Sequence, residues 1–125
     1  MSQTKSIQRS LKLIKEYGWL YWITEKWNHY TKRREDLYNF CDILCLEGKR
    51  TIAIQACGSD YQAHVIKIME NEYVIPWLEA GNELQVWSFR QYLKKRGGKA
   101  KEWRVNKTDV FSVKGELYFE DPEEL

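Results

Sequence analysis

Two polar side chains interrupt two apolar segments that follow one another in the sequence. Asp42 lies in FCDILCL and Gln55 lies in TIAIQAC, and the charged turn Glu47–Arg50 separates the two segments. Side chains alternate along a strand, so Asp42 and Gln55 lie close together at one end of a sheet if the segments pair. Two oxygen ligands at that spacing would hold a hard cation such as Mg²⁺ or Mn²⁺, which activates water and neutralises charge on a phosphate. The alternative is structural, with Asp42 capping a turn and Gln55 bonding backbone or water, because buried polar groups need partners.

Hydrophobic periodicity and chain breakers predict the elements that position these two side chains. Helices are expected at Ser6–Tyr17, Asp60–Asn71 and Pro76–Ala80, and strands at Trp19–Trp27, Leu37–Leu46, Thr51–Cys57, Glu83–Tyr92, Trp103–Val113 and Leu117–Phe119. Asp60 is expected to cap its helix, and Lys114–Gly115 to join the last two strands as a hairpin. The order α-β-β-β-α-β, followed by extra C-terminal strands, predicts an α/β (α+β) fold with a mixed central sheet flanked by helices.

The charges divide the 125-residue chain into a basic body and an acidic end. All 20 Lys and Arg precede residue 115, whereas five of the 18 Asp and Glu follow it, so residues 1–115 carry a net charge of +7. The length suits one domain, which we assign to residues 1–115, with residues 116–125 as an acidic C-terminal tail. A basic body suits a polyanionic partner, and the tail would either cover the basic surface or stay disordered.

Three cysteines lie in apolar runs, at Cys41, Cys45 and Cys57. We expect reduced core thiols in a cytosolic protein, since disulfides are rare in reducing compartments. Cys41 and Cys45 are four residues apart in one expected strand and would share a face. The sequence contains no CxxC pair, no secretory h-region and no apolar run of membrane-spanning length. A cytoplasmic location without a membrane partner is therefore expected.

Two basic segments are candidates for binding nucleic acid. The candidate side chains are Lys32, Arg33 and Arg34 in the loop His29–Asp36, and Lys94, Lys95, Arg96, Lys99 and Lys101 in KKRGGKAK. Such side chains neutralise phosphates, and Gly97 and Gly98 would let the backbone approach closely. Trp103 and Arg104 follow directly and add the aromatic and basic mixture that nucleic-acid surfaces use. The alternative is that both segments are solvated loops.

The ordered series of motifs resembles the PD-(D/E)XK nuclease superfamily, most closely its small phage-encoded members with a Holliday-junction-resolvase-like core. There, a basic segment with RRxDLFGFxDIL precedes IGIQxTSGSN and a helix that carries a Lys. This chain has RREDLYNFCDILCL (Arg33–Leu46), IAIQACGSDYQ (Ile52–Gln62) and HVIKI (His64–Ile68), and WLEAGNELQVWSFR and KEWRV continue the same plan. The resemblance spans about Trp19–Val105 and implies a restriction-endonuclease-like α-β-β-β-α-β core.

The resemblance assigns roles at the strand motifs. Asp42 matches the metal-binding Asp of the superfamily, and Gln55 stands at the (D/E) position. Cys57 stands at the Lys position, so the motif is a degenerate QxC, and a thiol is a poor substitute for an ammonium. The carbonyl of Ala56 is implied as a further metal ligand.

Two further roles come from flanking elements. In some members the motif Lys has moved to the following helix, which makes Lys67 the candidate; a solvated helix lysine is the alternative. Glu25 precedes the Asp as a further metal ligand in such members, or it is an exposed residue paired with Lys26. Asp36 would support the metal or balance the neighbouring arginines.

The resemblance implies a metal-dependent DNA endonuclease that hydrolyses phosphodiester bonds, with branched or junction DNA as a candidate substrate and Mg²⁺ (or Mn²⁺) as cofactor. DNA is the expected partner, and a homodimer is an assembly that the resemblance allows. The alternative is a catalytically inactive nuclease-fold module that binds DNA or a protein, for example a phage factor acting on host defence in the host cytoplasm. The missing motif Lys and acid favour that alternative.

Overall fold

The computed structural model describes residues 5–125 except for the side chain of Arg34. Its elements are α1 (Lys5–Tyr17), β1 (Leu20–Ile23), β2 (Lys26–Asn28), β3 (Arg33–Glu35), β4 (Ile43–Glu47), β5 (Arg50–Cys57), α2 (Tyr61–Glu70), α3 (Val74–Glu79), β6 (Glu83–Leu93), β7 (Lys101–Val113), β8 (Glu116–Phe119) and β9 (Glu123–Glu124). None of the helices within this range is both long and apolar enough to cross a membrane.

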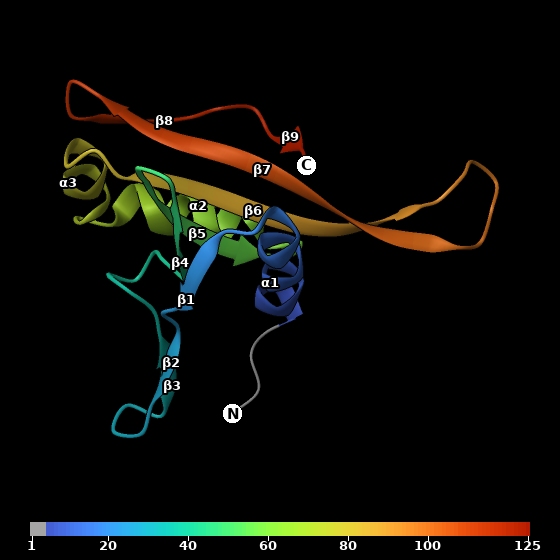
Figure 1. The fold of residues 1–125 in the computed structure, drawn as a ribbon, viewed down its shortest axis with the longest axis horizontal. Helices are drawn as coiled ribbons and strands as arrows, with labels where there is room; N and C mark the ends of the chain where they lie inside the picture. The colour runs from blue at the N-terminus through green and yellow to red at the C-terminus, as the bar shows by residue number, and fades with distance from the viewer. Residues whose placement is uncertain (1–4) are drawn as a thin grey trace.

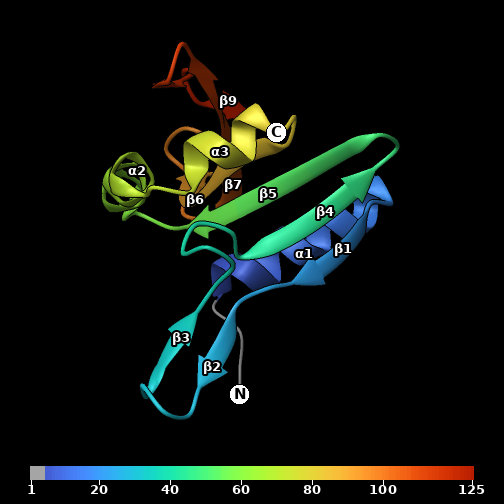
Figure 2. The same cartoon turned by 90° about the vertical axis from the view of Figure 1, so that its left-hand side faces the viewer.

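A mixed sheet forms the centre of the molecule (Figures 1 and 2). Within the described residues it has seven strands in the order β1-β4-β5-β6-β7-β8, and β9 also pairs with β7. Strands β5 and β6 are parallel, since α2 and α3 connect them, whereas the other neighbours are antiparallel. The prediction of a mixed sheet flanked by helices, with extra strands at the C-terminal end, is confirmed.

The helices cover opposite faces of this sheet. The α1 stripe Ile7, Leu11 and Ile14 packs on one face with Ile54 and Trp87. Helices α2 and α3 contribute Ile68 and Val74 to the core on the other face. Each fully buried side chain of this size contributes about 1.5–3 kcal/mol. The two cores therefore hold α1 and α2 on either side of the sheet end at which β5 stops.

The expected strand Trp19–Trp27 is broken in two. The backbone N–H groups of Thr24 and Glu25 both donate to the Asp42 carbonyl, at 2.9 and 3.3 Å, and the Thr24 hydroxyl donates to the Cys41 carbonyl. These bonds turn the chain out of the sheet, so β2 leaves it and pairs with β3 as a separate hairpin. The prediction of a loop over His29–Asp36 was wrong for β3, because a polar basic sequence carries no periodicity that signals a short exposed strand.

The expected strand Leu37–Leu46 begins only at Ile43. Tyr38 and Asn39 have φ of 52° and 64° and form a tight turn closed by the Leu37–Cys41 bridge. Cys41 therefore packs in the core under α2, whereas Cys45 packs under α1. The prediction that Cys41 and Cys45 share a face was wrong, because the turn resets the alternation.

All three cysteines are buried and free, as the sequence predicted. The hairpin through Lys114–Gly115 is also confirmed, since β7 pairs with β8 across it. The acidic end joins the sheet, with β9 paired to Asn106 and Lys107, and the Leu125 N–H donates to the Val105 carbonyl at 3.0 Å. In the described structure the tail is thus ordered along β7.

Candidate active site

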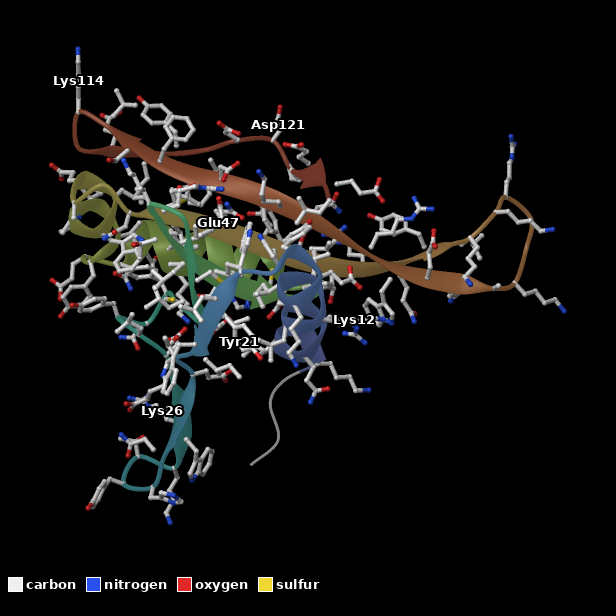
Figure 3. The ribbon with its side chains drawn as sticks, viewed as in Figure 1. Lys12, Tyr21, Lys26, Glu47, Lys114 and Asp121 are labelled. Atoms are coloured by element: carbon white, nitrogen blue, oxygen red, sulfur yellow. The ribbon has the colours of Figure 1, made fainter. Side chains whose placement is uncertain are left out.

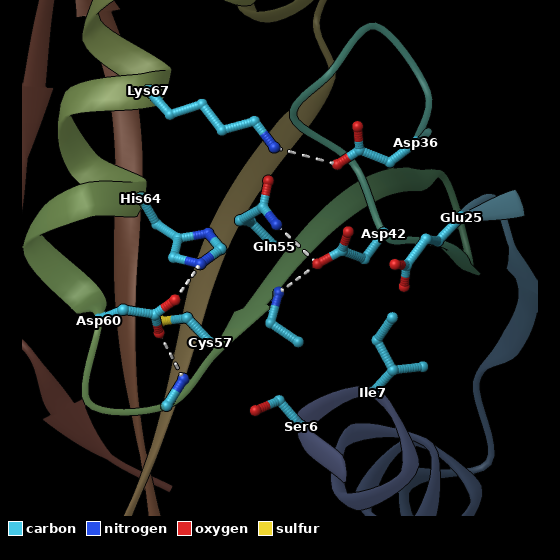
Figure 4. A pocket seen from close by; sticks show the side chains of 12 residues that line it. Ser6, Ile7, Glu25, Asp36, Asp42, Gln55, Cys57, Asp60, His64 and Lys67 are labelled. Atoms are coloured by element: carbon cyan, nitrogen blue, oxygen red, sulfur yellow. Dashed lines mark hydrogen bonds and ion pairs between the residues drawn. The ribbon is translucent and has the colours of Figure 1, made fainter. Parts of the chain in front are cut away.

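A pocket of about 270 Å³ opens at the end of the sheet where β4 begins and β5 ends (Figure 4). The antiparallel pairing of these strands places the start of one beside the end of the other, with Ile43 opposite Ile54. Asp42 and Gln55 are therefore neighbours, which confirms the predicted proximity. The pocket is lined by Ser6, Ile7, Glu25, Asp36, Asp42, Gln55, Ala56, Cys57, Gly58, Asp60, His64 and Lys67.

The Asp42 carboxylate is buried with partners. Its Oδ2 accepts a hydrogen bond from Gln55 Nε2 at 2.6 Å and another from the backbone N–H of Ala56 at 2.9 Å. Regular backbone pairing between β4 and β5 ends at this point, so the carboxylate occupies the place that a strand carbonyl would take. The structural interpretation is confirmed in part, because Asp42 accepts from the backbone of β5, although Gln55 bonds the Asp42 side chain rather than backbone or water. Asp42 also lines the pocket, and the metal site stays a prediction.

The pKa of Asp42 is raised from its ordinary value to about 8. Burial of the carboxyl is the largest cause, and repulsion from Asp36 and Glu25 adds to it, while the Ala56 N–H acts in the opposite direction. Asp36 and Glu25 thus act on Asp42 in the pocket that all three line. The arrangement favours a proton or a bound cation at Asp42 near neutral pH.

Two buried atoms of the pocket residues, Gln55 Oε1 and His64 Nδ1, have no hydrogen-bond partner among the described residues. Leaving a buried acceptor unpaired costs about 1–3 kcal/mol. Gln55 uses its amide nitrogen on Asp42, so its oxygen is left for a ligand that offers positive charge or a proton. Gln55 Oε1 is therefore a candidate ligand atom in this pocket.

Lys67 reaches the pocket from α2. Its Nζ lies 3.4 Å from Asp36 Oδ2, and its side chain is 42% exposed. Cys57, which occupies the motif position for a lysine, is buried, and burial raises the pKa of its thiol to about 12. A neutral thiol supplies no positive charge to a phosphate, so Lys67 is the ammonium group on this wall of the pocket.

Asp60 is the N-cap residue of α2, as predicted, but its side chain makes no capping hydrogen bond to the helix. Its Oδ1 accepts from the Gly58 N–H at 3.0 Å, and its Oδ2 lies 3.0 Å from His64 Nε2. Although partial burial opposes it, these bonds and the charge interaction with His64 hold the pKa of Asp60 below its usual range. Asp60 thus orients His64, because the tight turn at Gly58 aims the carboxylate along the helix rather than at its N-terminus.

The predicted metal ligands converge on the pocket, although no three His, Cys, Asp or Glu side chains within residues 5–125 form a metal-binding group. The donors would be the Asp42 carboxylate, the Gln55 amide oxygen and the Ala56 carbonyl, which lies on the same strand edge as the Ala56 N–H. All are hard oxygen donors of the kind that Mg²⁺ prefers, and Glu25 lines the same pocket. The residues present therefore fit a hard divalent cation.

Arg90 is a functional candidate that the sequence reasoning missed. It is exposed on β6, and its charge lowers the pKa of Cys57, a pocket residue, against the larger effect of burial. Arg90 lies two residues after Ser88, and Ser88 pairs with Cys57 in the parallel register. The sequence does show that Arg90 directly follows the buried run Leu84–Phe89. Its position relative to the pocket, however, depends on the parallel register of β5 and β6.

The predicted DNA-binding residues lie on two projections. Lys32 and Arg33 are exposed on the β2–β3 hairpin, whose entry and exit residues Glu25 and Asp36 line the pocket. The side chain of Arg34 lies outside the described residues. The second group is exposed at the far end of β6 and β7: Lys94, Lys95, Arg96, Lys99 and Lys101.

Comparisons of the chain with models of protein families, with curated proteins and with solved structures find no match. What the pocket can do therefore follows from its own residues.

Proposed function

We propose that this chain is a metal-dependent deoxyribonuclease of the PD-(D/E)XK kind, acting on phosphodiester bonds in DNA, with branched or junction DNA as a candidate substrate. One observation carries the proposal: a buried carboxylate, Asp42, lies beside the unpaired amide oxygen of Gln55 in a pocket that the ammonium of Lys67 also lines. The parallel pairing of β5 with β6, which follows the helices α2 and α3, supports it because the expected core also has a helix before its last strand.

The residues divide the work between holding a cation and holding a phosphate. Asp42, Gln55 and the Ala56 carbonyl would bind Mg²⁺ or Mn²⁺, with Glu25 as a further carboxylate. When bound, such a cation supplies Lewis-acid stabilisation of the phosphate charge and a water of lowered pKa. Lys67, which Asp36 holds at 3.4 Å, orients the phosphate and stabilises the negative charge that develops on it.

A second candidate is a nuclease-fold module that binds DNA or a host protein without cleaving. The buried neutral thiol of Cys57 at the motif position favours it, as does the ion pair that occupies Lys67. A phage factor that acts on host defence would be such a module. For either function we propose a cytoplasmic location, since three free buried thiols suit a reducing compartment.

The test is a titration of Mg²⁺ or Mn²⁺ into purified protein with linear, single-stranded and four-way-junction DNA. Asp42→Ala should abolish cleavage, and Lys67→Ala should lower it roughly 10²–10³-fold through loss of one charged donor. Lys49→Ala, an exposed turn residue, is the matched control and should retain full cleavage. Metal-dependent cleavage by Asp42→Ala would overturn the proposal, and DNA binding without cleavage by the unmodified protein would favour the second candidate.

A further inference from the structure

Strands β6 and β7 continue well beyond the rest of the sheet as a two-stranded ribbon (Figure 1). Strand β5 pairs with β6 as far as Ser88, and β9 pairs with β7 at Asn106 and Lys107. From the Arg90–Arg104 pair to the Leu93–Lys101 pair, the two strands pair with each other alone in the described structure. We call residues 90–104 the arm.

The arm concentrates positive charge. Its basic residues are Arg90, Lys94, Lys95, Arg96, Lys99, Lys101 and Arg104, against the single acid Glu102. Arg90 and Arg104 are directly opposite each other, an arrangement of like charges that destabilises a strand pair. In the described part of the chain, none of the five cations from Lys94 to Lys101 forms an ion pair with a carboxylate. Residues 94–101, which we call the tip of the arm, therefore leave their positive charges available to a negatively charged partner.

The root of the arm, by contrast, is fastened to the body. The Arg9 guanidinium of α1 lies 3.4 Å from the centre of the Trp103 ring. Arg104 pairs with Glu102 at 2.9 Å and with Glu124 at 3.7 Å. These contacts fix the direction in which the ribbon leaves the molecule, while its side chains beyond the root extend into solvent (Figure 3).

One face of the arm continues the wall of the pocket. Side chains alternate along β6, so Ser88, Arg90 and Tyr92 share a face, and Ser88 is level with Cys57 of the pocket. The opposite face carries Trp103 and lies on the α1 side. A polyanion with one phosphate in the pocket would thus run along the Arg90 face toward the tip.

We propose that the arm enters a groove of B-form duplex DNA and holds the duplex at a set distance from the pocket. The major groove of B-DNA, about 12 Å wide, admits a two-stranded β-ribbon. The deep and narrow major groove of A-form RNA does not, which favours DNA over duplex RNA. The distance between the DNA bound by the arm and the bond cleaved in the pocket rests on the proposed function. DNA binding by the arm does not itself require cleavage.

The length of the arm sets that distance. Lys94 lies six positions after Ser88 in the chain. At about 3.3 Å per strand residue, the tip therefore lies about 20 Å beyond the pocket. At about 3.4 Å per base pair this corresponds to about six base pairs. The arm contributes to affinity only when the duplex extends at least that far from the pocket.

The test compares two charge-matched variants, each lacking two exposed lysines. Lys95→Gln/Lys99→Gln removes charge from the tip, and Lys49→Gln/Lys114→Gln removes it from the β4–β5 and β7–β8 turns. Binding to hairpin-closed DNA duplexes of about 4, 12 and 18 base pairs, one length below the predicted spacing and two above it, is measured in EDTA by fluorescence anisotropy at several salt concentrations. Unchanged melting temperatures establish that both variants are folded.

The tip variant should bind the longest duplex at least tenfold more weakly than the turn variant, with a salt slope shallower by about 1.8, since each lost phosphate contact removes about 0.9. On the shortest duplex the two variants should be equal. Equal affinities at every length would overturn the proposal, as would an equal tip-dependent loss on duplex RNA of the same length. Length-dependent binding without cleavage in Mg²⁺ would refute the proposed nuclease activity and leave duplex binding by the arm in place. Cleavage with length-independent binding would refute only the proposed role of the arm.

Discussion

The β2–β3 hairpin and the arm are both basic projections, but they are built differently. The hairpin has three residue pairs of its own and is secured by local polar bonds, with Asn28 Oδ1 accepting from the Tyr30 N–H at 2.8 Å. The arm extends two long core strands and is fastened at its root by Arg9 and Trp103. A short isolated hairpin is marginally stable, whereas the arm is continuous with two strands of the packed sheet.

The difference lies also in what each root touches. The hairpin begins after Glu25 and ends before Asp36, two pocket residues that act on the pKa of Asp42. The arm begins beyond the pocket and contributes Arg90 at its edge. Changes at the hairpin root should therefore affect chemistry, and changes in the arm should affect affinity.

The largest expected effect is at the hairpin root. Asp36→Asn removes the carboxylate that holds Lys67 and should lower single-turnover cleavage about 10²-fold, the size of one mispositioned charged group. Duplex affinity should stay within about twofold of the unmodified protein, since the arm is untouched. Glu116→Gln, an exposed acid on β8, is the control. Parallel losses of cleavage and affinity would contradict the separation of the two roots.

A smaller effect is expected at the arm root. Trp103→Ala removes the ring under Arg9, an interaction of about 0.5–2 kcal/mol, and should lower both the free energy of unfolding and, severalfold, the affinity for long duplexes. Trp22→Ala is the control, because it removes another exposed tryptophan: Trp22 is 67% exposed and Trp103 is 46% exposed. Trp22 lies on the edge strand β1, away from the arm. Equal affinity losses in the two variants would show that the arm needs no anchor.

The last expected effect is on stability as a function of pH. The pKa of Asp42 is raised in the folded state, so between its ordinary value and about 8 the folded protein binds the proton more tightly than the unfolded chain. Stability therefore falls as the pH rises through this range. Asp42→Asn removes the titration, and its melting temperature in EDTA should gain several degrees on the unmodified protein between pH 4 and pH 8, with no further gain above.

Lys95→Gln, in the arm, should keep the unmodified pH profile, because the groups that shift the pKa of Asp42 are Ala56, Asp36 and Glu25, and none of them belongs to the arm. A constant offset between Asp42→Asn and the unmodified protein at every pH would contradict the raised pKa. The measurement is thermal unfolding followed by circular dichroism.

Much of the sheet and half of the pocket were predictable from local patterns. The period-two alternation in the segments around Asp42 and Gln55, with a short charged turn between them, determines that the two side chains meet, as the 2.6 Å bond shows. The helical spacing of Ile7, Leu11 and Ile14 likewise determines which face of α1 is buried. These signals are local, because each depends on the geometry of a single strand or helix.

Non-local contacts decided what was missed. The Asp42 carbonyl accepts from the backbone N–H groups of Thr24 and Glu25, and these bonds break the first strand. The sequence around residue 24 does not indicate that its hydrogen-bond partner lies 18 residues later. The height of Arg90 above the pocket depends on the parallel register of β5 and β6. The pairing of the acidic end with β7 depends on an open sheet edge that exists only after folding.

The sequence by itself thus determined which residues are candidates for the chemistry, since residue type and strand or helix period are properties of short stretches of chain. Only the tertiary structure decided that Lys67 meets Asp36, that four carboxyl groups line one pocket, and that one basic segment is an arm and the other a hairpin. The reason is physical: proximity between residues distant in the chain is set by packing and register, which the local pattern restricts but does not specify.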